Sequence, residues 1–129
     1  MTENEKITIL YVDDEEINLF TFKAIFKKKY EVFTAISAQK GLDLLSQKDI
    51  SIQAVISDLA MPEMDGLSFI TVAKSQYPNL LTFLLTAYDL NDEIQNALNS
   101  KLIYQYLSKP LNAGALEKAI ANGLQDSTN

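Results

Sequence analysis

The sequence predicts a doubly wound α/β protein, in which five parallel strands alternate with five helices. Two observations support this fold class: short apolar runs recur five times along the chain, and each is followed by a segment with helical periodicity. Parallel strands need right-handed crossovers, so such an alternation places helices on both faces of one sheet. The 129 residues suffice for one domain. We expect residues 1–129 to form a single domain with a core over about 7–124 and polar ends.

The strands are predicted from apolar, β-branched runs. They are residues 7–12, 32–35, 54–57, 80–85 and 104–108. The first run, Ile7 to Val12, is continuously apolar, which is typical of a strand buried on both faces. The third ends on a carboxylate, Asp58, and is followed by the chain-turning pairs Met61-Pro62 and Asp65-Gly66. The fifth is shorter and more polar, so we expect it at an edge of the sheet.

The helices are predicted from apolar residues that recur on one face. After the acids that follow the first strand, Ile17, Phe20 and Ala24 share such a face. The other four helices carry Leu42 and Leu45; Leu67, Ile70 and Ala73; Ile94, Ala97 and Leu98; and Leu116, Ala119, Ile120 and Leu124. Ser37 is placed to cap the second helix, and the third should stop before Pro78. The polar tail, residues 125–129, is expected to be frayed.

Composition excludes several classes of function. The chain has no Cys and no His, so thiol catalysis, thiolate metal sites and imidazole chemistry are excluded. All 11 cationic residues are Lys and the net charge is −6, which disfavours direct binding of nucleic acid. The one basic run, Lys27-Lys28-Lys29, is interpreted as a solvated helix end. Apolar runs are too short to span a bilayer and the first residues are not a signal peptide, so we expect a soluble, cytoplasmic protein without membrane contact.

Polar side chains follow four of the predicted strands. They are Asp13 and Asp14 after the first, Asp58 after the third, Thr86 after the fourth and Lys109 after the fifth. In an open α/β sheet the active crevice lies beyond the carboxyl ends of the strands, where the strand order reverses. With the order 2-1-3-4-5, the first and third strands are neighbours and their three carboxylates come together.

Three carboxylates in one cleft require a cation. Two of them about 4 Å apart repel by roughly 4 kcal/mol at an effective dielectric constant near 20. Lys109 supplies one positive charge, and oxygen ligands without His or Cys favour a hard divalent ion such as Mg²⁺, which also accepts phosphate oxygens. The arrangement suits phosphoryl transfer, in which Mg²⁺, Lys109 and the Thr86 hydroxyl stabilise phosphoryl oxygens while a carboxylate attacks.

Five motifs, in this order along the chain, resemble the signature of the receiver domain of two-component response regulators. They are Asp13-Asp14; Asp58 with Met61-Pro62; Asp65-Gly66; Thr86-Ala87; and Tyr106 to Pro110. The similarity runs from about Ile7 to Leu124. It implies the flavodoxin-like (βα)5 form of the predicted fold. It also implies a phosphoacceptor switch rather than an enzyme with its own substrate, since such domains catalyse only their own phosphorylation and dephosphorylation.

The resemblance implies a role for each acid. Asp58 would accept the phosphoryl group from a phosphohistidine on a sensor histidine kinase or a histidine phosphotransfer protein. Asp14 would bind Mg²⁺ directly and Asp13 mainly through water. Asp58 and the backbone carbonyl of Ala60 would complete the protein ligands.

The resemblance also implies how the switch operates. Lys109 would pair with Asp58 before transfer and with the phosphoryl group afterwards. Thr86 would move toward that group and Tyr106 would turn inward, changing the surface of the last two helices and the fifth strand, with a phosphorylation-dependent dimer as one outcome. The Lys109-Pro110 peptide is a candidate for the cis form. Ala60 and Tyr88, two residues after Asp58 and Thr86, predict slow self-dephosphorylation, because Ala60 cannot orient a water and Tyr88 can shield the site.

Three other functions are open. A phosphatase of the haloacid-dehalogenase type also forms an aspartyl phosphate, but it has a second acid two residues after the nucleophile, where this chain has Ala60. A flavodoxin-like cofactor carrier would need a phosphate-cradling loop, and the acids would repel a flavin phosphate. A receiver-like scaffold that is never phosphorylated is disfavoured because all five chemical positions hold suitable residues.

Overall fold

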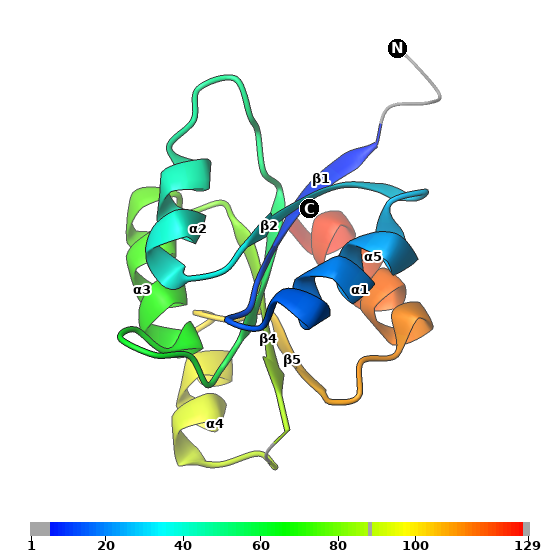
Figure 1. Ribbon diagram of the computed structural model, residues 1–129. Coiled ribbons are helices and arrows are strands. Elements are labelled where there is room, and N and C mark those ends of the chain that lie inside the picture. Colours follow the sequence, from blue (N-terminus) through cyan, green and yellow to red (C-terminus); the bar gives the residue numbers. More distant parts are fainter. Residues whose placement is uncertain (1–5, 88, 128–129) are drawn as a thin grey trace.

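The protein consists of a five-stranded parallel sheet with helices packed on both of its faces (Figure 1). The computed structural model describes residues 6–87 and 89–127. The strands are β1 (Ile7–Val12), β2 (Tyr30–Ala35), β3 (Ala54–Asp58), β4 (Leu81–Thr86) and β5 (Gln105–Ser108). The helices are α1 (Glu16–Phe26), α2 (Ala38–Leu45), α3 (Gly66–Gln76), α4 (Asp92–Asn99) and α5 (Ala113–Ser127).

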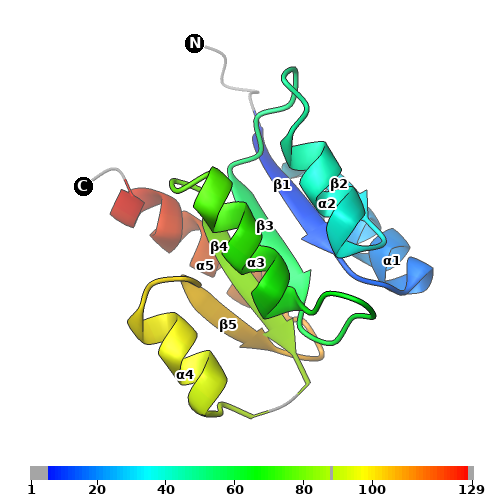
Figure 2. The same cartoon turned by 90° about the vertical axis from the view of Figure 1, so that its left-hand side faces the viewer.

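The strand order is β2-β1-β3-β4-β5, which Figure 2 shows with β5 at one edge. Every neighbouring pair is parallel, and β1 pairs with β3 through the register Val12↔Ser57. The predicted doubly wound fold and its strand order are therefore confirmed. Because all strands run in one direction, the sheet has a carboxyl end, where the strands stop, and an amino end, where they start.

Alternation along the strands divides the core into two layers. Ile9 and Tyr11 of β1 face the layer covered by α1 and α5, and Leu10 and Val12 face the layer covered by α2, α3 and α4. Residues 9–12 of β1 and all of β3 and β4 are almost completely buried on both faces, which explains their largely apolar sequences. β5 is less buried, as expected for an edge strand.

Helix starts follow the residues that cap them. The side chains of Ser37, Asp65 and Asn91 each accept a hydrogen bond from a backbone N–H in the first turn of α2, α3 and α4. The cap at Ser37 was predicted, and α3 ends at Gln76, before Pro78, as expected. The apolar residues predicted on α3 are all buried.

The prediction that Ile17, Phe20 and Ala24 form the buried face of α1 is wrong. Ile17 and Phe20 are 66% and 73% exposed, and Ala24 is exposed as well. The helix instead buries Phe22, which stacks on Tyr11 of β1, and Phe26, whose ring packs against Phe22 at an angle of 45°. This helix carries two overlapping apolar faces, the predicted one with Ile17 and Phe20 and the observed one with Phe22 and Phe26. The second face packs on the core because its two aromatic rings fill the space over β1.

Several boundaries also differ from the predicted ones. β2 begins at Tyr30, two residues before the predicted run, and the other differences in the strands are of one residue. The last helix continues through Ser127, so residues 125–127 are helical rather than frayed, and residues 128–129 of the predicted tail lie outside the described residues. The run Lys27-Lys28-Lys29 lies at the end of α1 and is exposed, in agreement with its interpretation as a helix end.

Across residues 6–87 and 89–127, none of the helices combines the length and the apolar character that crossing a bilayer requires.

Candidate functional site

The carboxyl end of the sheet brings Asp13, Asp14 and Asp58 together. Asp13 and Asp14 follow β1 directly, and Asp58 is the last residue of β3, the neighbouring strand. One carboxylate oxygen from each of the three lies within 4.8 Å of the others. We call these residues the acid cluster. Asp13 and Asp58 are buried, and Asp14 is the most open to solvent of the three.

Lys109 forms an ion pair with the central acid. Its Nζ lies 2.9 Å from Oδ1 of Asp58, and the Asp58 side chain is only 8% exposed. Burial raises the pKa of Asp58, and the charges of Asp13 and Asp14 raise it further, against the lowering effect of Lys109. Burial lowers the pKa of Lys109, but the hydrogen bond and charge of Asp58 outweigh this and leave it raised. The lysine therefore stays charged, and the cluster retains an excess of negative charge.

Asp13 is held by three hydrogen-bond donors. The Tyr11 hydroxyl donates to its Oδ2 at 2.6 Å, and the Asn18 side-chain amide donates to the same oxygen at 3.1 Å. The backbone N–H of Glu15 donates to Oδ1 at 2.9 Å. Burial and the hydrogen bond to Asp13 raise the pKa of Tyr11 well above its ordinary value, so the hydroxyl remains a donor. The carboxylate is fixed in place by its own strand and by the start of α1.

Thr86 ends β4 and Lys109 follows β5, the two strands on the far side of Asp58. Thr86 is the last residue of β4 and is 1% exposed. The backbone N–H of Lys109 donates to the Thr86 carbonyl at 2.9 Å, which holds the residue after β5 beside the end of β4. Tyr106 lies on β5 beside Leu84 and is half-buried. The Lys109-Pro110 peptide is cis, as the resemblance implied.

The loop after Asp58 turns sharply beneath the cluster. The backbone N–H of Gly66 donates to the Leu59 carbonyl at 2.8 Å, and Glu63 has a φ of 70°. A Cβ at Gly66 would lie 2.3 Å from the Asp58 carbonyl oxygen, so no larger residue fits without moving the backbone. Ala60 is exposed in this loop. Tyr88, to which the predicted shielding was assigned, lies outside the described residues.

The sequence predicts the charged residues that meet here but not two of the side chains that donate hydrogen bonds to Asp13. The apolar run Ile7 to Val12 predicts Tyr11 only as a strand residue, and no pattern in the sequence points to Asn18. Strand alternation could have identified Tyr11, because a residue two positions before Asp13 projects from the same face of the sheet. The exposed start of the helix gave no comparable signal for Asn18.

The residues of the acid cluster fit a hard divalent cation. They offer oxygen ligands only, from carboxylates that already lie within 4.8 Å of one another. Mg²⁺ is bound in proteins by one or two carboxylates together with waters and phosphate oxygens. In the described part of the chain, every buried side-chain nitrogen and oxygen has a hydrogen-bond partner, so the site is built without an orphaned polar group.

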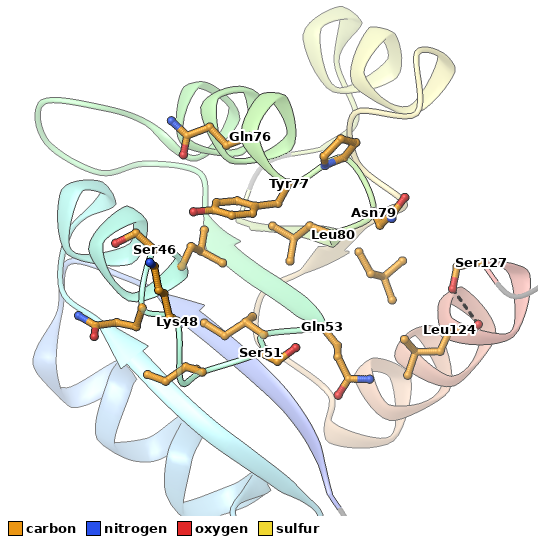
Figure 3. Close-up of a pocket in the computed structure, with 16 residues that line it drawn as sticks. Ser46, Lys48, Ser51, Gln53, Gln76, Tyr77, Asn79, Leu80, Leu124 and Ser127 are labelled. Carbon is orange, nitrogen blue, oxygen red and sulfur yellow. Dashed lines mark hydrogen bonds between the residues drawn. The ribbon is translucent and has the colours of Figure 1, made fainter.

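An open hollow of about 700 Å³ lies at the amino end of the sheet, away from the acid cluster. Figure 3 shows its lining, which comes from the ends of α2, α3 and α5 and from the loops that lead into β3 and β4. Gln53, Gln76 and Tyr77 contribute neutral polar groups, and among the described residues Lys48 is the one charged member of the lining. Within residues 6–87 and 89–127, the hollow brings together no set of charged or reactive groups.

The fold and the site together define a class. An open parallel sheet with a buried carboxylate, a lysine and two further acids at its carboxyl end is an α/β protein whose oxygen ligands suit a cation, at the edge where such sheets bind ligands. The sequence profile of the response regulator receiver domain matches residues 9–121. The chain therefore belongs to this family. Receiver domains act as signalling switches, are phosphorylated by sensor kinases and bind Mg²⁺ at an acidic cluster.

Relatives in sequence include transcriptional regulators. The chain is 31% identical over 122 residues to the transcriptional regulatory protein GlrR of Escherichia coli, covering 92% of this chain and 26% of that protein. It is 31% identical over 113 residues to the response regulator protein FleR of Pseudomonas aeruginosa, covering 88% and 23%. The chain spans about a quarter of the length of these curated relatives.

Solved structures agree with the fold. The signal receiver domain of an HD domain-containing protein from Pseudomonas fluorescens is 30% identical and superposes with a TM-score of 0.85, covering 96% of this chain and 98% of that one. A CheY-like response regulator receiver domain from Methanospirillum hungatei is 26% identical, with a TM-score of 0.84 and the same coverage of 96% and 98%.

Proposed function

We propose that this chain is a phosphoacceptor switch in which Asp58 receives a phosphoryl group from a phosphohistidine on a sensor histidine kinase or a histidine phosphotransfer protein. The observation that carries the proposal is the 2.9 Å pair between Lys109 and a buried Asp58 inside the acid cluster. A carboxylate that is buried, paired with one lysine and bordered by two further acids is costly to keep charged. Its placement is explained by a reaction in which it acts as the nucleophile.

The transfer is a displacement at phosphorus. An Asp58 carboxylate oxygen forms the new O–P bond, the N–P bond of the phosphohistidine breaks, and the imidazole nitrogen keeps the electron pair. Mg²⁺ held by Asp13, Asp14, Asp58 and the Ala60 carbonyl would neutralise charge on the phosphoryl oxygens. Lys109 then exchanges its partner, from the Asp58 carboxylate to a phosphoryl oxygen.

Thr86 and Tyr106 couple this event to the surface. Thr86 is buried beside the site and its hydroxyl is the group that would donate to the phosphoryl group. Tyr106 is half-buried on the adjacent edge strand, and an inward turn of its ring would carry the change from the site to that edge of the sheet. The phosphoryl group stabilises the inward arrangement selectively, so the α4, β5 and α5 surface shifts in population. A partner or a second copy of the chain reads that surface.

The setting proposed for this switch is the cytoplasm, with residues 1–129 as one receiver domain and no direct contact with nucleic acid or membrane. We also propose a slow loss of the phosphoryl group. Ala60 has no polar side chain with which to orient an attacking water. Replacing it, as Ala60→Asn, is expected to shorten the lifetime of the phosphorylated protein, which loss of label from isolated phosphoprotein in Mg²⁺ measures.

The test of the proposed function is phosphorylation with acetyl phosphate and Mg²⁺. Phos-tag electrophoresis should show a shifted band that disappears in Asp58→Asn. The matched control is Asp43→Asn, which changes an exposed acid on α2 and should keep the band. A shifted band that persists in Asp58→Asn, or the absence of such a band in the unchanged protein, would contradict the assignment of Asp58 as the phosphoacceptor.

The proposed change of the α4, β5 and α5 surface is tested separately, with beryllofluoride and Mg²⁺ in place of the phosphoryl group. NMR shifts are expected to concentrate on α4, β5 and α5, and sedimentation shows whether a dimer forms. Shifts confined to the loops around Asp58 would contradict the proposed coupling. Steady turnover of a simple phosphate ester would instead favour the phosphatase alternative.

A further inference from the structure

Tyr11 lies on β1 directly beneath the acid cluster. Its ring stacks on Phe22 of α1, with ring centroids 4.2 Å apart and an angle of 13° between the planes. The side chain is buried, and its hydroxyl donates to Oδ2 of Asp13 at 2.6 Å. Because the stack fixes the ring, the hydroxyl holds the carboxylate from a fixed point in the core.

The donors around Asp13 occupy its two oxygens unequally. Oδ2 accepts from both Tyr11 and Asn18, whereas Oδ1 accepts only from the backbone N–H of Glu15. A carboxylate oxygen has about two lone-pair positions. Oδ2 is therefore fully used by these two donors, and Oδ1 keeps one position free.

We propose that Tyr11 is a positioning residue of the magnesium site, which together with Asn18 occupies Oδ2 of Asp13 and leaves Oδ1 to face the ion or one of its waters. This inference rests on the proposed function, since it needs the ion at the acid cluster. Groups that hydrogen-bond to a metal ligand fix its orientation, and losing one typically weakens metal binding about 10- to 100-fold. Without the hydroxyl, the buried Asp13 carboxylate would have to be reoriented before it could serve the ion.

The test compares two tyrosines. Tyr11→Phe removes the hydroxyl and keeps the ring stack, so the fold is retained. Tyr104→Phe is the matched control, because the Tyr104 hydroxyl also donates to an aspartate at 2.6 Å, Asp126 near the end of α5. Calorimetric titration with MgCl2 should give a dissociation constant raised about tenfold in Tyr11→Phe and unchanged in Tyr104→Phe.

Two further readouts separate positioning from a general structural effect. The rate of phosphorylation of Tyr11→Phe by acetyl phosphate should recover at saturating Mg²⁺, because only the occupancy of the ion is impaired. Asn18→Ala, which removes the second donor to Oδ2, should weaken Mg²⁺ binding in the same direction.

The outcomes are distinguishable. Wild-type affinity for Mg²⁺ in Tyr11→Phe, or equal weakening in Tyr104→Phe, overturns the role of Tyr11 and leaves the proposed function intact. Absence of Mg²⁺ binding in the unchanged protein overturns both. A tenfold loss confined to Tyr11→Phe, with recovery at high Mg²⁺, supports the inference.

Discussion

The two ends of the sheet differ in what they concentrate. The amino end has the open hollow of about 700 Å³, which the described part of the chain lines with neutral side chains and one lysine. The carboxyl end has three carboxylates and Lys109 within a few ångströms, held by strand ends and by the start of α1. The difference teaches that a hollow by itself does not make a reactive site. Converging charges do, because their mutual repulsion has to be balanced by a cation or relieved by reaction.

The largest expected effect is on the rate of phosphorylation, and it compares a lysine at the carboxyl end of the sheet with a lysine at the amino end. Lys109→Ala should slow phosphorylation by acetyl phosphate about 100- to 1,000-fold, because it removes the ammonium group that would stabilise the oxygens of the transferring phosphoryl group. Lys48→Ala, in the lining of the hollow, should leave the initial rate unchanged. Initial rates from quantified Phos-tag gels measure both. Equal slowing in the two variants would remove the distinction between the ends.

Mg²⁺ should stabilise the protein through the carboxyl end alone. At a concentration one hundred times its dissociation constant, an ion that binds only the folded state raises the free energy of unfolding by about 2.7 kcal/mol. Urea unfolding with and without MgCl2, at matched ionic strength, measures this gain. Asp14→Asn should lose most of it, whereas Asp43→Asn should keep it. The comparison fails if Asp14→Asn is stabilised as strongly as the unchanged protein.

Two glycines, Gly66 near the carboxyl end and Gly123 near the amino end, allow the rigidity of the two ends to be compared through the stability of their alanine variants. Gly66→Ala should cost about 1–3 kcal/mol, because the new methyl group meets the backbone of Asp58. Gly123→Ala should cost less. There the methyl group meets only the Leu81 side chain, at 2.7 Å, and Leu81 borders the hollow and can shift into it. Urea unfolding of both variants is the measurement, and a larger loss in Gly123→Ala would show that the amino end is the more rigid one.

The smallest expected effect depends on pH. The pKa of Asp58 is raised by burial and by the neighbouring acids. The folded state therefore binds the Asp58 proton more tightly than the unfolded chain does, and ionisation of this residue destabilises the fold as pH rises above the ordinary carboxyl range. Without Mg²⁺, Asp58→Asn should be more stable than the unchanged protein at pH 7. The difference should shrink as pH falls through the Asp58 pKa, where both side chains are neutral.

Thermal unfolding at a series of pH values checks this last expectation. A difference between the two proteins that stays constant across the series, or that grows toward low pH, would show that the acid cluster does not oppose the charge on Asp58.

Local sequence was sufficient for the elements and for the charged residues of the site. The alternation of apolar runs with helical periods predicted the order of strands and helices along the chain. The order 2-1-3-4-5 within the sheet came with the predicted fold class, and the switch-point rule then located the crevice. Asp13, Asp14, Asp58 and Lys109 were identified as a group because each follows a strand, and parallel strands end at the same side of a sheet.

Side-chain direction was harder to predict where two patterns overlapped. On α1, Ile17 and Phe20 have the spacing of a core face, yet they are exposed and the neighbouring rings of Phe22 and Phe26 are buried. Periodicity specifies that a face exists but does not select between two competing faces. Packing against Tyr11 selects the aromatic one.

The sequence by itself determined the fold class and which acids meet, because strand period and strand order depend on local pattern and general topology. Only the tertiary structure decided how those acids are held. The hydrogen bonds of Tyr11 and Asn18 to Asp13, the 2.9 Å pair of Lys109 with Asp58, and the close approach of Gly66 to the Asp58 carbonyl each join segments that adopt fixed positions only when the whole sheet is packed. Distances of this kind depend on the complete core, which no local pattern in the sequence specifies.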